Sequence, residues 1–356
     1  MGGGGAERVV SLLSGALAEK GNDVTVFTLV GGESFYPLNP KIHFESVGIS
    51  VNRKNKLTAA FSKIKFFPKS FFAIRKKLRK EKYDVVISML TECDILVGLC
   101  RRFGVKCKHI CSERNDPTRR KPSYMRLLKK TYKKSSLFVC QGKRVYDYYD
   151  CVPESIKKII PNPIDGETLP ERIITDSKRV VGVGRLNKQK NFPLLIKSFA
   201  SLGDDFKDFR LDIYGEGPER KALEELIENL NVKDRVTLCG AQKNVKELIS
   251  DAEMFVMSSD YEGFPNALLE AMAIGLPVIS TDFSTGIASE LIDKENGAVI
   301  PVGDEAALTD AMRTLLSDKE KRISMGENNR EKCKRFYTPN ILAEWESAID
   351  EVVGRK

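Results

Sequence analysis

Apolar positions recur along this chain in two patterns, as short apolar runs and as longer stretches in which they return every three or four residues. The short runs predict buried strands, and the longer stretches predict amphipathic helices. The expected strands are 23–29, 84–89, 137–141, 179–183, 210–214, 236–239, 254–257, 277–281 and 298–301. The expected helices are 6–19, 192–202, 219–230, 266–274 and 305–316. This alternation predicts an α/β fold of parallel sheets covered by helices.

The length of 356 residues suits two domains. Prolines and charged residues replace the periodic pattern between Pro161 and Ser177. We therefore expect an N-terminal domain over 1–165 and a second domain from 166 onward.

The start of the chain departs from the usual order of a doubly wound domain, which is a strand, a glycine-rich turn and a helix. Here Met1 leads directly into Gly2–Gly5 and the first expected helix. A central strand that is missing would leave its two neighbours unpaired. We therefore expect that the natural chain has about 8–10 further residues upstream, enough for one strand and a lead-in.

Charge divides the chain into two unequal halves. Residues 1–170 carry 32 basic and 16 acidic side chains, whereas residues 171–356 carry 26 and 33. The two domains are thus expected to face different partners. The eight cysteines form no Cys-x-x-Cys pair and the chain has two histidines, so we expect reduced thiols and no zinc site.

Two segments combine a strand end with polar side chains. Arg185 and Lys190 flank the loop after strand 179–183, and two cations at a carboxyl strand end suit a diphosphate. The alternative is a solvated basic loop.

Glu262 lies in the loop that follows strand 254–257, and Glu270 lies after that loop. Carboxylates accept hydrogen bonds from sugar and ribose hydroxyls. The alternative is a helix cap and a surface residue. Pro265 suits the first position of the helix that carries Glu270.

The glycine run Gly2–Gly5 leaves several readings open. It is a flexible leader, a cloning remnant, or a loop that brings backbone N–H groups to a phosphate at a helix start.

The combined motifs resemble family 4 of the retaining glycosyltransferases over nearly the whole chain. The motifs, in the order seen in that family, are Gly4-Gly5-Ala6-Glu7, Asn162-Pro163-Ile164-Asp165, Gly184-Arg185…Lys190, Tyr214-Gly215-Glu216-Gly217-Pro218 and Glu262-x7-Glu270. The resemblance implies two Rossmann-like domains with parallel sheets facing across a cleft (GT-B type). It also implies that 166–335 is the nucleotide-sugar domain and that 336–356 is a last helix crossing back to the first domain.

The resemblance assigns a role to each matching residue. Arg185 and Lys190 would hold the donor diphosphate, Glu270 the ribose hydroxyls, and Glu262 the hydroxyls of the transferred sugar. The segment Gly263, Phe264, Pro265 and Asn266 would support phosphate and sugar through its backbone N–H groups, which Pro265 itself lacks, and Gly4 and Gly5 would approach the same site. Asn162 would contribute to the substrate site. Such enzymes use neither metal nor cofactor, and the chain contains no Asp-x-Asp pair for a divalent ion.

One position departs from the family pattern. Many members carry a histidine beside the transferred sugar, but the matching stretch here reads Ser112-Glu113-Arg114-Asn115. Arg114 or Glu113 is expected to take over that contact, and His109, which lies within a strand, is expected to be structural.

Basic residues gather in two segments of the first domain. Residues 53–82 contain twelve Lys and Arg with interleaved aromatics, and 101–134 contain thirteen. Such amphipathic segments commonly lie in a membrane interface, although a charged helix covering its own domain is the alternative. We expect a cytoplasmic protein associated with the inner face of the membrane, acting on a lipid-linked glycan with a UDP-sugar.

Three other functions remain open from sequence. They are transfer from GDP-mannose to a soluble acceptor, nucleic-acid binding by the basic half, and a nicotinamide-dependent dehydrogenase. A dehydrogenase needs Gly-x-Gly-x-x-Gly, but Gly182-x-Gly184 is followed by Asn187. Nucleic-acid binding leaves the Glu262 and Glu270 segment unexplained, so we expect no nucleic-acid partner.

Overall fold

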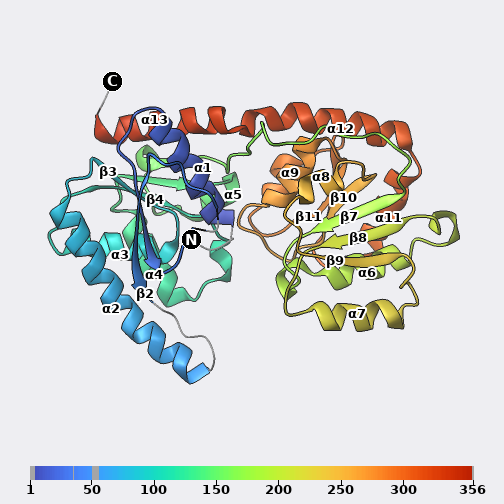
Figure 1. Cartoon of the computed structure of the whole chain (residues 1–356), viewed down its shortest axis with the longest axis horizontal. Coiled ribbons are helices and arrows are strands. Elements are labelled where there is room, and N and C mark those ends of the chain that lie inside the picture. The colour runs from blue at the N-terminus through green and yellow to red at the C-terminus, as the bar shows by residue number, and fades with distance from the viewer. Residues whose placement is uncertain (1–4, 35, 50–55, 355–356) are drawn as a thin grey trace. The chain divides into compact units, whose positions relative to one another are not determined.

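The computed structural model describes the backbone of residues 5–34, 36–49 and 56–354 and divides the chain into two compact units. Unit 1 comprises Met1–Gln141, Val145–Pro163 and Thr338–Lys356, and unit 2 comprises Gly142–Arg144 and Ile164–Tyr337. The chain therefore passes from unit 1 to unit 2 after Pro163 and returns after Tyr337 (Figure 1). The boundaries expected from the sequence analysis were after residues 165 and 335.

Unit 1 contains two parallel sheets. Strands β1 (Thr25–Val30) and β2 (His43–Ile49) form one, and β3 (Val85–Ser88), β4 (Lys108–Ser112), β5 (Leu137–Cys140) and β6 (Lys157–Ile159) form the other in chain order. No ladder joins the two sheets in the described part of the chain. The strand expected upstream of Gly2–Gly5 lies outside the described residues.

The helices of unit 1 cover these sheets. They are α1 (Gly5–Glu19), α2 (Lys56–Lys80), α3 (Thr91–Arg102), α4 (Pro122–Tyr132), α13 (Thr338–Val353) and the greater part of α5 (Lys143–Tyr148), whose first two residues belong to unit 2. Helix α13 buries Ile341, Leu342, Trp345 and Ala348 and packs against α1 and β3. It belongs to unit 1 although it follows unit 2 in the chain.

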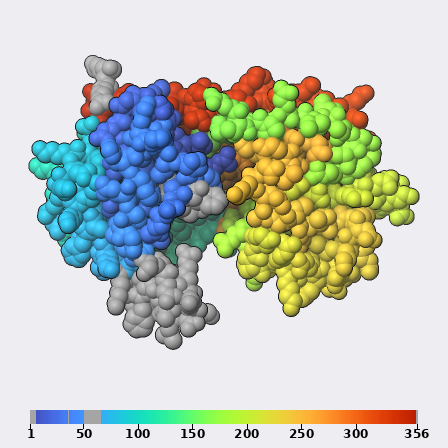
Figure 2. Space-filling view, in the orientation of Figure 1, coloured from blue at the N-terminus to red at the C-terminus, as the bar shows by residue number. Residues whose placement is uncertain are grey.

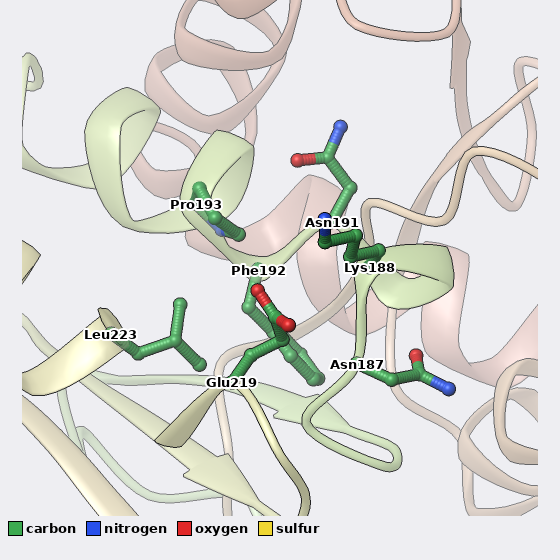
Figure 3. A pocket seen from close by; sticks show the side chains of 7 residues that line it. All are labelled: Asn187, Lys188, Asn191, Phe192, Pro193, Glu219 and Leu223. Atoms are coloured by element: carbon green, nitrogen blue, oxygen red, sulfur yellow. The ribbon is translucent and has the colours of Figure 1, made fainter. Parts of the chain in front are cut away.

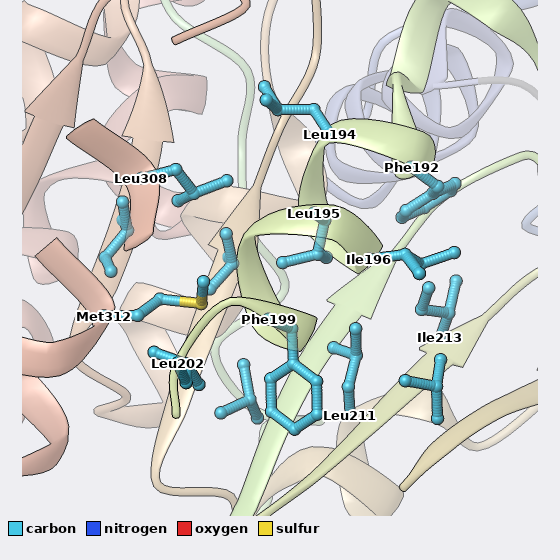
Figure 4. Packing of buried hydrophobic residues seen from close by; sticks show 14 of the residues in the cluster. Phe192, Leu194, Leu195, Ile196, Phe199, Leu202, Leu211, Ile213, Leu308 and Met312 are labelled. Atoms are coloured by element: carbon cyan, nitrogen blue, oxygen red, sulfur yellow. The ribbon is translucent and has the colours of Figure 1, made fainter. Parts of the chain in front are cut away.

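Unit 2 contains one six-stranded parallel sheet in the order β12-β11-β10-β7-β8-β9. The strands are β7 (Arg179–Val183), β8 (Arg210–Tyr214), β9 (Val236–Gly240), β10 (Met254–Met257), β11 (Val278–Thr281) and β12 (Gly297–Ile300). The helices are α6 (Phe192–Ala200), α7 (Arg220–Asn229), α8 (Val245–Ile249), α9 (Asn266–Ile274), α10 (Ile287–Leu291), α11 (Glu305–Leu316) and α12 (Lys319–Cys333). Apolar residues of α6, α11 and the strands pack into one core (Figure 4).

The strand order of unit 2 reverses at the pair β7 and β10. From β7 the sheet grows through β8 to β9 on one side, and from β10 through β11 to β12 on the other. In open α/β sheets, ligands bind beyond the carboxyl ends of the strands at such a reversal. The loops after β7 and β10 are therefore the first place to look for a site.

The prediction of two parallel α/β units is confirmed, with some differences in single elements. Pro265 stands at the N-cap of α9 and not at its first helical position, because its ψ of 72° is not helical. Helix α12 escaped prediction because its exposed residues are mostly charged and polar, so apolar periodicity is weak. Asp318 caps it by accepting a hydrogen bond from the backbone N–H of Lys321 (2.9 Å).

Two further observations concern the thiols and the length of the helices. All eight cysteines are free thiols, as predicted. Among the described helices, none combines the length and the apolar character that a bilayer crossing requires.

Candidate functional site

The loops after β7 and β10 are fastened to each other at the reversal point of the unit 2 sheet. Ser258 donates its hydroxyl to the carbonyl oxygen of Lys190 (2.9 Å), and the backbone N–H of Asp260 donates to Gln189 O (2.9 Å). The Gln189 side chain donates to Tyr261 O (2.9 Å). Two loops that lie far apart in the chain thus form one rigid edge.

Lys190 and Glu262 form an ion pair within this edge. Lys190 Nζ lies 2.7 Å from Glu262 Oε1, and their side chains are only 16% and 9% exposed. The same oxygen accepts from Ser259 Oγ (2.7 Å), and Oε2 accepts from Gln189 Nε2 (3.2 Å). Since a carboxylate offers about four acceptor positions, Glu262 retains room for one further donor such as a hydroxyl.

Arg185 lies in the same loop with its side chain exposed. It makes no hydrogen bond or ion pair from its guanidinium to any residue that the structure describes. An exposed guanidinium beside a half-buried ammonium provides two cations of different geometry, one able to bind an anion in a bidentate way.

Glycines in the loop after β8 allow it to approach the loop after β7 closely. A Cβ on Gly215, whose φ is +149°, would lie 1.9 Å from the carbonyl oxygen of Gly184. One on Gly217 would lie 2.2 Å from Leu186 O. The segment Gly215–Pro218 therefore presses its backbone against the Arg185 loop.

Helix α9 begins directly beyond Glu262. The first helical hydrogen bond of α9 runs from the backbone N–H of Leu269 to Pro265 O (3.0 Å), so the first turn carries N–H groups without helical acceptors. The N–H of Asn266 is an exception, since it donates to Phe264 O (3.0 Å). Gly263 is half-buried and Phe264 is buried. The positive end of α9 thus lies next to the Lys190–Glu262 pair.

Glu270 lies on α9 and is half-buried. Four of the expected residues therefore lie in unit 2, either in the two joined loops or in the helix that follows them. They are Arg185, Lys190, Glu262 and Glu270.

The expected residues of unit 1 have a different environment. Arg114 and Asn162 are both buried, and Arg114 Nη1 donates to Asn162 Oδ1. The Arg114 guanidinium also lies over the ring of Trp345, 5.6 Å from its centroid. Burial lowers the pKa of Arg114 to about 10. Gly5 begins α1, and Gly4 lies outside the described residues.

Glu113, the other expected replacement for the family histidine, is occupied. It forms a paired contact with Arg120 and accepts from the hydroxyls of Tyr149 (2.7 Å) and Tyr132 (3.3 Å). With 1% exposure it contributes to the core of unit 1 and offers no surface to a sugar.

Asp94, His109 and Cys111 form the group of side chains closest in chemistry to a metal site among the described residues. All three are buried, and Ser88 hydrogen-bonds both Asp94 and His109 Nε2 (2.7 Å). Burial lowers the pKa of His109 to about 3, so its ring is neutral near pH 7, and burial also raises the pKa of Asp94. The hydrogen bonds account for this cluster, and His109 has the structural place that the sequence indicated.

A pocket lies beside the loop that carries Lys190. Its lining includes Asn187, Lys188 and Phe192 with Glu219 and Leu223 facing them (Figure 3). Its volume of about 190 Å³ is below the usual range for drug-sized ligands, roughly 300–1,000 Å³. It is too small to hold a nucleotide sugar.

Family models match both parts of the chain. The model "Glycosyltransferase Family 4" matches residues 3–168, and "Glycosyl transferases group 1" matches residues 169–332.

Two similar curated proteins come from Campylobacter jejuni. One is an N-acetylgalactosamine-N,N'-diacetylbacillosaminyl-diphospho-undecaprenol 4-alpha-N-acetylgalactosaminyltransferase, 30% identical over 94% of this chain and 93% of its own. The other is named GalNAc-alpha-(1->4)-GalNAc-alpha-(1->3)-diNAcBac-PP-undecaprenol alpha-1,4-N-acetyl-D-galactosaminyltransferase. It is 28% identical over 98% of this chain and 96% of its own.

Solved structures share the fold at low identity. Sucrose-phosphate synthase from Thermosynechococcus elongatus superposes with a TM-score of 0.85 at 20% identity, covering 99% of this chain and 94% of that one. Anabaena Alr3699/HepE, solved in complex with UDP, gives 0.78 at 16% identity, covering 98% and 96%.

Proposed function

Because this chain belongs to glycosyltransferase family 4, we propose that it is a retaining transferase that moves a hexose or N-acetylhexosamine from a UDP-sugar to a lipid-linked glycan. The observation that carries the proposal is the Lys190–Glu262 pair at the point where the strand order of unit 2 reverses. There, fixed cations, a carboxylate with acceptor capacity and the positive end of α9 lie together.

The donor would be held from three directions. Arg185 and Lys190 neutralise its diphosphate, helped by N–H groups of Gly263 and Phe264 and of the first turn of α9 beyond Asn266. Glu262 accepts a hydrogen bond from a hydroxyl of the transferred sugar. Glu270, farther along α9, accepts from the ribose.

The chemical step follows from this charge distribution. The sugar–phosphate bond breaks as negative charge grows on the departing diphosphate, and preorganised cations stabilise that charge without reorganisation. The acceptor hydroxyl attacks the face of the sugar from which the diphosphate leaves, and its proton passes to the departing phosphate. We propose that Arg185, Lys190 and α9 carry out the role that a divalent metal has in other transferases.

The acceptor side rests on unit 1 and on the named substrates of the Campylobacter relatives, which are undecaprenyl-diphosphate-linked glycans. In α2, the exposed residues Lys69, Phe72, Lys76, Arg79 and Lys80 recur at helical spacing. Phe72 is 63% exposed, and this part of α2 forms a surface of unit 1 (Figure 2). Cations around an exposed aromatic suit an anionic leaflet.

We propose that the two basic segments, 53–82 and 101–134, hold the protein on the cytoplasmic face of the membrane, where a lipid-linked acceptor is presented. Residues 53–55 of the first segment lie outside the described residues. Most other described aromatics of α2, including Phe66, Phe67 and Phe71, pack inward. The helix thus covers its own unit and still presents a basic outer face.

The test combines binding with transfer. UDP, GDP and UDP-sugars are compared for their effect on the melting temperature, since a ligand that binds only the folded state must raise it. UDP-GalNAc, UDP-GlcNAc, UDP-glucose and GDP-mannose are then tried with an undecaprenyl-diphosphate-linked GalNAc-diNAcBac disaccharide, with and without EDTA. We expect UDP to stabilise and an α-linked product to form in EDTA.

The outcomes separate the parts of the proposal. No stabilisation by UDP or GDP at saturation would overturn the donor site, and a product of inverted configuration would overturn the retaining mechanism. Glu262→Gln is the variant of choice because it keeps the size and shape of the side chain while removing its charge and exchanging one acceptor oxygen for an NH2 donor. Loss of activity in EDTA would contradict metal independence.

A further inference from the structure

The carboxyl ends of all four strands in the larger sheet of unit 1 are connected through the side chain of Arg114 and its hydrogen-bond partner Asn162. Arg114 itself lies two residues beyond β4. Its Nη1 donates to Asn162 Oδ1, beyond β6, and its Nη2 lies 3.4 Å from Met89 Sδ, directly beyond β3. The same Asn162 oxygen accepts from Gln141 Nε2, directly beyond β5.

The plane of the guanidinium makes a third contact. It lies over Trp345 of α13, which is fully buried. Lys108 at the start of β4 donates to Val352 O of the same helix, so α13 follows β4 from one end to the other. Arg114 therefore joins the four strand-end loops to the helix that returns from unit 2.

The burial of the Arg114 guanidinium carries an electrostatic cost, since desolvation lowers its pKa. Arg114 is 93% buried, yet no carboxylate of a described residue lies within ion-pair distance of it. Its Nε and the Nε1 of Trp345 both lack a hydrogen-bond partner among the described residues. A buried cation without a counter-ion costs free energy, and an apolar residue of similar volume is often the more stable choice.

A direct contact with substrate fits these observations poorly. Both terminal nitrogens of Arg114 are engaged, and one face of its guanidinium is covered by Trp345. Its planar group with five donors is the side chain that can reach loops in several directions at once.

We propose that Arg114 is a positioning residue, which fixes the loops after β3, β4, β5 and β6 as one ligand-binding edge and does not itself touch the sugar. The inference rests on the proposed function, in which this edge of unit 1 receives the acceptor. Ligands of parallel α/β sheets bind at this edge, so its geometry sets how the attacking hydroxyl is presented.

The first test is the variant Arg114→Met, which keeps the length and apolar bulk of the side chain. We expect kcat for transfer to fall about ten- to hundredfold, the range for loss of hydrogen bonds to a charged group. The KM for the UDP-sugar and the rise in melting temperature caused by UDP should stay unchanged, because the proposed donor residues lie in unit 2. Arg114→Lys should not restore kcat, since one ammonium cannot replace the planar contacts.

Trp345 supplies a signal that is independent of activity. It is the one tryptophan of the chain, so tryptophan fluorescence, excited at the long-wavelength edge of its absorption, reports on the ring beneath Arg114. We expect Arg114→Met to change the intensity or wavelength of this emission, and Arg119→Met, which alters an exposed arginine of the same loop, to leave it unchanged.

A double-mutant cycle with Asn162→Ala completes the experiment. If the two side chains act as one unit, the double variant should be no slower than the slower single variant. Wild-type kcat in Arg114→Met, or a raised acceptor KM at unchanged kcat, would overturn the inference. A wild-type protein that neither binds UDP nor transfers sugar would instead overturn the proposed function.

Discussion

Lys190 Nζ and Glu262 Oε1 lie 2.7 Å apart although 72 positions separate the two residues in the chain. The pair is held in place before any substrate arrives, because Ser259 and Gln189 also bind the carboxylate. The ammonium is therefore oriented by the protein. In the proposed mechanism it would need no rearrangement to meet a developing negative charge, which is the condition for effective electrostatic stabilisation.

The ammonium of Lys190 is expected to be essential for turnover. Lys190→Met should lower kcat for transfer by about 10²–10³, the loss seen when one preorganised donor to a developing anion is removed. The donor KM should change less, because Arg185 and α9 remain. Steady-state kinetics with a saturating acceptor measures both constants.

Lys188 provides the matched control for this variant. It lies two positions away in the same short turn and is exposed. Lys188→Met should keep wild-type kinetics, and equal losses in the two variants would show that general loop charge, not the Lys190–Glu262 pair, is responsible.

The glycine at position 215 is expected to be required for the fold of the unit 2 edge. Its φ of +149° disfavours any other residue, and a Cβ would lie 1.9 Å from Gly184 O. Gly215→Ala should therefore destabilise unit 2 by about 2–4 kcal/mol, a typical loss where strain and a backbone clash combine. Chemical unfolding followed by circular dichroism measures the change.

Gly203→Ala is the control for backbone conformation without a clash. Gly203 also has a positive φ, +89°, but nothing lies within 4 Å of its added Cβ. We expect a loss of only about 1 kcal/mol there. Similar losses at both positions would contradict the role given to the close approach of Gly215 to Gly184.

Sequence patterns alone located most strands and helices of unit 2 and the two loops that form its candidate site. Apolar runs identify β7 and β10, and polar residues after each strand indicate the ligand edge. That the two strands are neighbours follows from topology, which a single sequence does not contain, so the Lys190–Glu262 contact could be expected only through family resemblance. The Asn266 N–H, expected to face a ligand, instead closes a local turn with Phe264.

The environment of Arg114 shows a different limit. Its partners Met89, Asn162 and Trp345 come from segments far apart in the chain, and none of them carries a local signal pointing to an arginine. Asn162 did stand out, as the first residue of its motif. The motif indicated that the residue matters but not which side chain holds it.

Burial of His109 predicts a pH dependence of stability. Burial lowers its pKa in the folded state to about 3, whereas an unfolded histidine titrates near 6.5. The neutral ring therefore favours folding fully above about pH 6.5, and this contribution is lost as pH falls toward 3 because the unfolded state takes up the proton first.

The corresponding variant is His109→Gln, with urea unfolding measured between pH 7.5 and 5. Below pH 6.5 the wild type should lose up to about 1.4 kcal/mol per pH unit more than the variant. His43→Gln replaces the other histidine, whose side chain is exposed, and serves as the control. Parallel pH curves for wild type and His109→Gln would refute the burial argument.

The outer face of α2 is expected to bind anionic membranes through Lys69 and Lys76, which flank the exposed Phe72. Each lysine near an anionic leaflet contributes about 1 kcal/mol, so the double variant Lys69→Gln/Lys76→Gln should bind vesicles roughly 30-fold more weakly. Sedimentation with vesicles of 70% phosphatidylcholine and 30% phosphatidylglycerol measures this binding. Raising the salt concentration should weaken vesicle binding of the wild type, because charge attraction is screened.

Lys221→Gln, on the exposed face of α7 in unit 2, is the control and should bind vesicles like the wild type. An equal loss in the control, or tight binding of all variants at high salt, would show that this face of α2 is not the docking surface.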